Sequence, residues 1–191
     1  MLILGSSSPR RREILGYFKI PFEQISPDFD EEAEPFEGDP VAFATRLAKG
    51  KALSLSAHHP KRTILTADTL VFKEGKLFSK PSSSEEAFEM LKTFNGQWHS
   101  VFTAVVSARD GECFSDYGET QVLFHRVPDE DLRLYHRAFS GQDKAGGYGI
   151  QMGGSIIIKK IEGCFYNVMG LPLSPVVHVL RKLVIDLLSY L

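Results

Sequence analysis

Short apolar runs alternate along the chain with amphipathic stretches, and together they predict a mixture of strands and helices. Residues 2–5 (LILG) and 63–72 (TILTADTLVF) are apolar or β-branched and predict buried strands, the second with a kink or turn near Asp68. Two longer strand-like runs, residues 98–109 and 113–125, are joined by an Asp-Gly pair typical of a hairpin turn. Strands interleaved with helices, with a hairpin among them, predict an α/β or α+β fold with a mixed sheet.

Capping residues mark where the helices start. Serine or aspartate directly before proline, at Ser8-Pro9 and Asp39-Pro40, predicts two helix starts, and apolar spacing carries the second helix to about Ala57. A capping box at residues 83–86 predicts another helix. The apolar stretch at residues 174–191 contains charged residues, so we expect an amphipathic core helix there and not a membrane span.

The composition limits the classes of partner. The chain has 191 residues, no visible repeat and a formal net charge of -2, so we expect one domain, residues 1–191, that recruits neither nucleic acid nor a membrane surface. Cys113 and Cys164 are far apart and lack the spacing of a zinc site, which suits a reducing compartment. No secretory signal pattern begins the chain, and we expect a cytoplasmic protein.

The segment at residues 5–12, GSSSPRRR, places three hydroxyls, a proline and three arginines directly after an apolar strand. Free backbone N–H groups at a helix start bind phosphate oxygens, helped by the positive end of the helix dipole. Arginines in the first turn oppose that dipole unless an anion offsets them. The segment therefore predicts either an anion site or a solvated basic turn. It is not a Walker A loop.

A carboxylate in an apolar strand is the second candidate. Burying Asp68 without a partner would cost several kcal/mol, and a metal ion, a lysine or a water to be activated would each offset that cost. The alternative is a strand-end aspartate that caps a turn. The acidic run at residues 29–34 offers a second oxygen ligand or is simply a solvated face. Lys51, Lys80 and Lys144 are candidate counter-charges, although a single lysine is more often solvated.

The glycine-rich stretch at residues 140–154 is the third candidate. Its glycines allow close backbone approach to a ligand, Tyr148 could line that ligand, and the amide of Gln151 could read the edge of a base. An ordinary turn between helix and strand explains the composition equally well. His99 alternates with apolar residues, which predicts a hydrogen-bonded structural histidine and not a catalyst.

Taken together, seven stretches resemble the Maf-like nucleoside triphosphate pyrophosphatases over nearly the whole chain and in that family's order. The stretches are GSSSPRRREIL, RLAKGKA, TADTLVF, KPSSSEEAFEML, GQWHSVFTAV, DKAGGYGIQ and IEGCFYNVMGLPL. The resemblance implies an elongated mixed sheet with flanking helices, and two lobes around a central cleft, as in Ham1-like or ITPase-like proteins. It also implies hydrolysis between the α- and β-phosphates of a nucleoside triphosphate, with Mg²⁺ or Mn²⁺, by a homodimer.

The resemblance also assigns roles to residues of this chain. Asp68 is the expected general base, and Asp68 with Glu31 is the expected metal-binding pair. The expected substrate-binding and specificity residues are Arg10, Arg11, Lys51, Thr69, Lys80 and Gln151. Arg10, Thr69 and Gln151 resemble the branch that acts on dTTP and UTP, whereas a related branch acting on 7-methyl-GTP usually has Gln after the aspartate. A non-enzymatic, nucleotide-binding regulator of septum formation is the alternative from another class.

Overall fold

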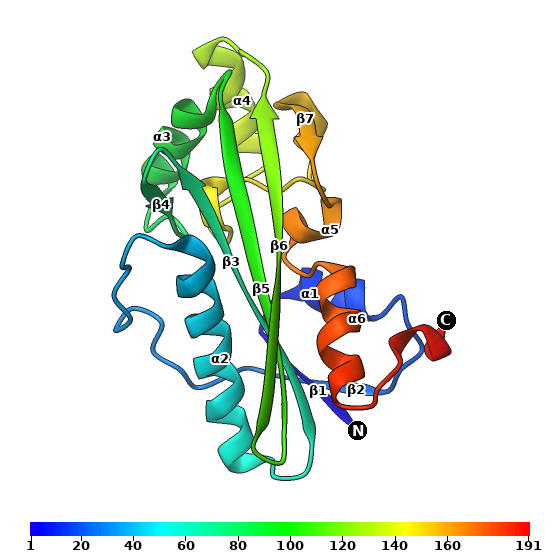
Figure 1. Ribbon diagram of the computed structural model, residues 1–191. Helices are drawn as coiled ribbons and strands as arrows, with labels where there is room; N and C mark the ends of the chain where they lie inside the picture. The colour runs from blue at the N-terminus through cyan, green and yellow to red at the C-terminus, as the bar shows by residue number, and fades with distance from the viewer. The chain divides into compact units, whose positions relative to one another are not determined.

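The computed structural model describes residues 1–191, and its main element is a seven-stranded mixed sheet (Figure 1). The strands are β1 (Leu2–Gly5), β2 (Phe22–Ile25), β3 (Thr63–Lys73), β4 (Lys76–Phe78), β5 (Trp98–Arg109), β6 (Glu112–Phe124) and β7 (Ile158–Glu162). Their order is β2-β1-β3-β5-β6-β7, and β4 pairs with β3. β1 is parallel to β2 and β3, whereas β4 and β7 are antiparallel to β3 and β6. The predicted mixed α/β class is confirmed.

The helices alternate with these strands along the chain. They are α1 (Pro9–Leu15), α2 (Pro40–His58), α3 (Ser84–Phe94), α4 (Asp129–Ala138), α5 (Phe165–Met169) and α6 (Leu173–Lys182), with short 3-10 turns at Ala145–Gly147, Gly154–Ile156 and Leu187–Tyr190. None of them combines the length and the apolar composition that crossing a lipid bilayer requires.

The chain forms two compact units, each assembled from separate stretches. The first unit contains residues 1–68, 103–118 and 170–191, and the second contains residues 69–102 and 119–169. The long strands β3, β5 and β6 each contribute residues to both units. The expected single domain and the expected cleft between lobes stay predictions.

In the first unit, side-chain hydroxyls on the buried strands bond to backbone carbonyls of the helices that pack on them. The hydroxyl of Thr66 on β3 donates to the carbonyl of Ala48 on α2 over 2.7 Å. The hydroxyl of Ser107 on β5 donates to the carbonyl of Val179 on α6, also over 2.7 Å. Figure 1 shows α2 to the left of these strands and α6 to the right. β1 lies between two parallel neighbours with all four of its residues buried, as its apolar sequence predicts.

In the second unit, an aromatic cluster lies beneath α3 and α4. Phe94 at the end of α3 makes edge contacts with Phe78 and Phe124, at ring-centroid distances of 4.8 and 5.9 Å. Leu132 of α4 is fully buried in the same cluster. This packing explains the apolar faces that the sequence places on both helices.

Most of the predicted local signals are confirmed. Ser8 and Asp39 cap α1 and α2, and each is followed by proline at the first helical position. Ser83 caps α3, because its hydroxyl accepts from the N–H of Glu86. The carboxylate of Glu86 accepts from Ser82 and not from the N–H of Ser83, so one half of the predicted capping box forms. Asp110 and Gly111 both have positive φ, 51° and 84°, in the turn between β5 and β6, as a two-residue hairpin requires.

Two local predictions are wrong. β3 runs without a turn through Asp68, so this aspartate does not cap a strand end. The last apolar stretch is not one helix, because α6 ends at Lys182 and Val184 has a φ of 62°, which a β-branched residue in a continuing helix does not adopt. A separate turn at Leu187–Tyr190 follows.

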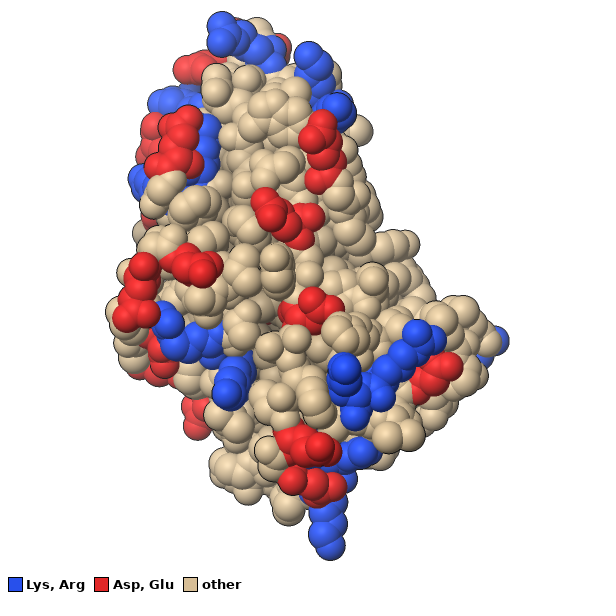
Figure 2. All heavy atoms as spheres, in the orientation of Figure 1, with Lys and Arg blue, Asp and Glu red and all other residues tan.

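Charges of both signs are interspersed on the face of the molecule shown in Figure 2, and neither sign dominates it. This agrees with the net charge of -2 and means that this face presents no field of one sign. Both cysteines are free thiols.

Candidate active site

The ammonium group of Lys51 connects two carboxylates in the first unit. Its Nζ lies 2.6 Å from Oδ1 of Asp68 and 2.9 Å from Oε2 of Glu31. The Lys51 and Asp68 side chains are almost fully buried, 8% and 7% exposed, whereas Glu31 is 42% exposed. A charged pair buried this deeply is held only where the charges satisfy one another, so Lys51 offsets the cost of placing Asp68 in an apolar strand. Of the three partners that the sequence allowed for Asp68, a metal ion, a lysine or a water molecule, the structure shows a lysine.

The local sequence explains how Glu31 reaches this pair. Phe29, two residues before Glu31, lays its ring against the backbone of α2 at Gly50. A Cβ at Gly50 would come within 2.3 Å of the ring of Phe29, so glycine is needed directly before Lys51. The contact holds the acidic loop against α2, the helix that carries Lys51. Glu31, which belongs to the charge run at residues 29–34, is therefore part of the cluster and not only a solvated residue.

Burial raises the pKa of Asp68, and the positive charges of Lys51 and Arg11 oppose that rise. The nearby charge of Glu31 adds to it. Desolvation outweighs the two cations because the carboxylate has lost nearly all contact with water. A carboxylate with a raised pKa beside cations can accept a proton from a water molecule, which is what a general base must do.

The three arginines of the first segment have different surroundings. Arg11 is fixed by the protein, since its Nε donates to the carbonyl of Gly170 over 2.8 Å and its Nη1 donates to Oγ of Ser6 over 3.2 Å. Burial lowers the pKa of Arg11, while the charge of Asp68 raises it. Arg10 is half-buried and Arg12 is exposed. The charges of Arg11 and Asp68 therefore interact, and protein contacts orient the Arg11 side chain. Its predicted role in substrate binding stays a prediction.

The serines before α1 are also engaged locally. Oγ of Ser6 accepts from the N–H of Ser8 over 3.2 Å, and Oγ of Ser8 accepts from the N–H of Arg11 at 3.5 Å. Two of the three hydroxyls thus shape the turn and cap the helix, and only Ser7 is exposed. These bonds use the oxygens as acceptors and leave each O–H able to donate, so the predicted anion site at this segment stays a prediction.

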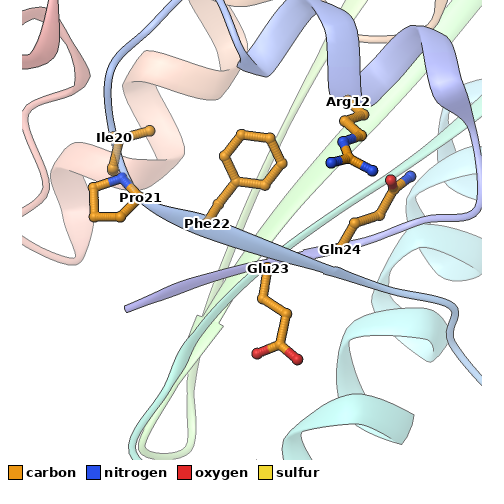
Figure 3. A pocket seen from close by; sticks show the side chains of 6 residues that line it. All are labelled: Arg12, Ile20, Pro21, Phe22, Glu23 and Gln24. Atoms are coloured by element: carbon orange, nitrogen blue, oxygen red, sulfur yellow. The ribbon is translucent and has the colours of Figure 1, made fainter.

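Gln24 is a positioning residue that sequence reasoning missed. From β2, its amide nitrogen donates to the carbonyls of Ser6 and Ser8, over 2.7 and 3.1 Å. Figure 3 shows Gln24 and Arg12 pointing toward one another beside Phe22, while Glu23 points to the opposite side of the strand. These residues line a hollow of about 600 Å³. A glutamine in a short strand carries no local signal for this role.

Replacing Gln24 with Leu is expected to lower the free energy of unfolding by about 1–3 kcal/mol, because two loop carbonyls lose their donor. Urea denaturation measures the change. Glu23→Gln is the matched control. Its side chain faces away from the loop, and glutamine keeps an oxygen for the exposed contact with Arg62, so a change under about 1 kcal/mol is expected. Equal stability of the Gln24→Leu and wild-type proteins would contradict the positioning role.

The remaining predicted site residues belong to the second unit. Thr69 follows Asp68 on β3 and is half-buried, and strand alternation turns its side chain to the other face. Lys80 is exposed just after β4, and Gln151 is exposed after the first 3-10 turn. Lys144 is buried, and its ammonium group pairs with the carboxylate of Asp143. The first unit contains the cluster of Arg11, Glu31, Lys51 and Asp68 and also Arg10. The second unit contains Thr69, Lys80, Lys144 and Gln151.

The glycine-rich segment is ordered differently from the prediction. Tyr148 does not line a ligand surface, because it is 4% exposed and packs among aromatic rings of the second unit. Its hydroxyl lies 2.7 Å from Nε2 of His99. The prediction of a hydrogen-bonded structural histidine is confirmed. Burial lowers the pKa of His99 to about 3, so the ring is neutral at physiological pH.

No three His, Cys, Asp or Glu side chains among residues 1–191 gather in a way that could hold a metal ion by themselves. Asp68 and Glu31 remain the pair that could contribute to one, because one oxygen of each already reaches the same cationic position, that of Lys51 Nζ.

Comparison with known proteins identifies the family. A relative from Chlamydia felis, named dTTP/UTP pyrophosphatase, is 51% identical over 191 residues, 100% of this chain and 97% of that protein. Relatives from Chlamydia trachomatis, with the same name, and Chlamydia muridarum, named nucleoside triphosphate pyrophosphatase, are each 44% identical over 100% of this chain and 97% of theirs. Among solved structures, the Ham1 protein of Staphylococcus aureus matches with a TM-score of 0.46 and 13% identity, covering 65% of this chain and 72% of that chain. The family model described as Maf-like protein matches residues 1–183, and this chain belongs to the Maf-like family.

Proposed function

We propose that this protein hydrolyses dTTP and UTP to the nucleoside monophosphate and pyrophosphate. The observation that carries the proposal is the buried Lys51–Asp68 pair with Glu31 on the same ammonium group, in a chain that belongs to the Maf-like family. A buried carboxylate beside cations suits the attack of water on a polyanion. The choice of dTTP and UTP as substrates follows the name dTTP/UTP pyrophosphatase, which the relatives from Chlamydia felis and Chlamydia trachomatis carry.

In the proposed reaction, ionised Asp68 takes a proton from the attacking water. A new bond forms between the water oxygen and the α-phosphorus, and the bond between the α-phosphorus and the oxygen that bridges to the β-phosphate breaks. Pyrophosphate leaves with the electron pair of that bond. Negative charge on the phosphates is neutralised by four cationic side chains, those of Arg10, Arg11, Lys51 and Lys80. Such cations lower the barrier most where they stabilise the charge that develops on the leaving pyrophosphate.

The proposal assigns base selection to Thr69 and Gln151. An exposed amide offers a donor and an acceptor together, which matches the donor and acceptor on the edge of a pyrimidine. Threonine after Asp68, where the 7-methyl-GTP branch usually has glutamine, supports the pyrimidine branch.

A divalent cation is part of the proposal. Mg²⁺ is usually held by one or two carboxylates together with substrate phosphates, and Asp68 and Glu31 provide such a pair. Mg²⁺ or Mn²⁺, when bound, would neutralise phosphate charge and ease deprotonation of water. The partly exposed side chain of Glu31 can turn toward an arriving metal nucleotide, whereas buried Asp68 is held in place by Lys51.

Incubation of the purified protein with single nucleoside triphosphates tests the function. With Mg²⁺ or Mn²⁺ present, dTTP and UTP are expected to release one pyrophosphate for each monophosphate, faster than dGTP, dATP or 7-methyl-GTP do. Coupled detection of pyrophosphate and orthophosphate, with chromatography of the nucleotides, measures the stoichiometry. EDTA is expected to abolish release, and added Mg²⁺ to restore it.

Three outcomes would redirect the proposal. Preferred cleavage of 7-methyl-GTP would assign the chain to the other branch. Nucleotide binding without pyrophosphate release would favour the non-enzymatic regulator, and orthophosphate as the first product would rule out cleavage between the α- and β-phosphates. The homodimer and the cytoplasmic location stay predictions.

A further inference from the structure

The interior of the second unit contains an isolated polar pair. His99 on β5 is 2% exposed and stacks on Phe94 with ring centroids 4.3 Å apart and the planes inclined by 27°. Tyr148 contacts the same group of rings edge-on, 5.0 Å from Phe124 and 5.5 Å from His99. Burial raises the pKa of the Tyr148 hydroxyl, so the hydroxyl keeps its proton. Both side chains are therefore neutral groups in aromatic surroundings.

The hydrogen bond between them is the only polar contact of either side chain. Nε2 of His99 meets the hydroxyl of Tyr148 at 2.7 Å, whereas Nδ1 of His99 is buried without a partner. A buried polar group costs free energy unless it is hydrogen-bonded. Breaking this one contact would leave both groups unsatisfied, which opposes any movement of Tyr148 out of the cluster.

The chain around Tyr148 packs tightly through its backbone. A Cβ at Gly147 would lie 3.0 Å from the carbonyl oxygen of Ala87, and one at Gly141 would lie 1.9 Å from the carbonyl oxygen of Gly147. The segment thus packs backbone to backbone, and it has few side chains that could fix it: Lys144 is buried beside Gly149, but its ammonium group bonds within the segment, to Asp143 and Ser140. Tyr148 is its buried aromatic side chain and joins it to the ring cluster outside the segment.

Gln151 follows Tyr148 by three residues and lies in the turn that begins directly after it. The N–H of Met152 donates to the carbonyl of Gly149 over 3.2 Å, which closes a turn around Gln151 directly after Tyr148. Oε1 of Gln151 lies only 3.4 Å from the position that a Cβ of Gly149 would take. A shift of Tyr148 would therefore carry the backbone and the side chain of Gln151 with it.

We propose that the His99–Tyr148 hydrogen bond anchors the glycine-rich segment and so sets the position of Gln151, which makes His99 a positioning residue for base selection. The inference rests on the proposed function in one respect, that Gln151 reads the base. The anchoring itself depends on contacts within the second unit and can be measured without catalysis.

The test uses the full chain with His99→Phe, Tyr148→Phe and His99→Gln. Phenylalanine keeps the aromatic packing and removes the hydrogen bond, whereas the side-chain amide of glutamine has both a donor and an acceptor and can replace Nε2 as the partner of the Tyr148 hydroxyl. For both phenylalanine variants, the ratio of kcat/KM for dTTP to that for dGTP is expected to fall about tenfold, about the effect of one misplaced hydrogen bond. His99→Gln is expected to recover part of the ratio. Inhibition by inorganic tripolyphosphate, which has no base, is expected to change less than about twofold.

His136→Phe is the matched control. His136 is a buried histidine of the same unit. Its Nε2 lies 2.9 Å from Oγ of Ser84, and its ring is tilted by 45° to that of Phe88 at a centroid distance of 5.9 Å. Its loss removes a similar hydrogen bond that does not involve the glycine-rich segment. This variant is expected to lose stability but keep the wild-type ratio.

Amide hydrogen exchange at residues 149–152 provides the readout that does not need activity. Exchange there is expected to rise in His99→Phe and Tyr148→Phe and to stay at the wild-type rate in His136→Phe. Unchanged exchange in the two anchor variants, or a dTTP to dGTP ratio within about twofold of wild type, would overturn the inference. If wild-type protein releases no pyrophosphate, the proposed function fails, and the exchange rates still decide whether the anchor exists.

Discussion

Replacing Asp68 with Asn is expected to lower kcat for pyrophosphate release by about 10²- to 10⁴-fold, the usual contribution of a general base. Asparagine has nearly the same shape and can still accept a hydrogen bond from Lys51 through its oxygen, but it cannot take a proton from water. Steady-state kinetics with dTTP measures the effect. The fall should appear in kcat more than in KM, because the lost interaction belongs to the transition state.

Asp110→Asn is the control for this substitution. Asp110 lies exposed in the turn between β5 and β6, at a positive φ that asparagine tolerates, so wild-type kinetics are expected. Circular dichroism of the two variants shows whether each one folds. Full pyrophosphate release from a folded Asp68→Asn protein would remove the general-base role.

The raised pKa of Asp68 predicts how activity and stability depend on pH. Activity needs the ionised form, so kcat/KM should fall as the pH drops through this pKa, above the value of about 3.9 for an ordinary aspartate. Stability changes in the opposite direction. Because the folded pKa exceeds the unfolded one, the contribution of Asp68 is fully present below the unfolded pKa and is lost as the pH rises through the folded pKa. Asp68→Asn should flatten the stability profile across that window.

Replacing Lys51 with Met is expected to lower the free energy of unfolding by about 3–5 kcal/mol at neutral pH, the usual result of removing one partner from a buried ion pair. Methionine fills the space of the lysine stem but has no ammonium group. Asp68 then loses a cation 2.6 Å away and Glu31 one 2.9 Å away, and buried Asp68 stays beside the charge of Glu31. Urea denaturation at several pH values measures the loss. Pyrophosphate release should also fall, because a phosphate-binding cation is gone.

The pH dependence of the Lys51→Met effect separates it from a simple packing defect. The charge of Lys51 lowers the pKa of Asp68, so its removal raises that pKa further. Asp68 then takes up a proton at a higher pH, and the stability deficit should shrink as the pH falls. Lys49→Met, an exposed position on the same helix, should change stability by less than about 1 kcal/mol at any pH. A deficit that does not depend on pH would contradict the charge argument.

The order of strands and helices could be predicted because their signals act over a few neighbouring residues. Proline after a capping residue starts α1 and α2, and the Asp-Gly pair forms the turn between β5 and β6. The break in the last helix was missed because the residues from 183 onward are apolar enough to continue it. Nothing nearby in the sequence marks the positive φ of Val184.

For the candidate site, the sequence by itself determined the residue types and, through the family resemblance, the expected chemistry. Only the tertiary structure decided the pairings. Lys51 meets Asp68 across 17 residues of chain, and Gln24 meets Ser6 across 18, because α2 and β2 pack beside the strands that bring those groups together. Tyr148 likewise became an anchor and not a ligand contact, since burial among rings of distant segments outweighs what its glycine neighbours suggest. Such contacts depend on how much apolar surface each element can bury, a property of the whole unit that no short stretch of residues encodes.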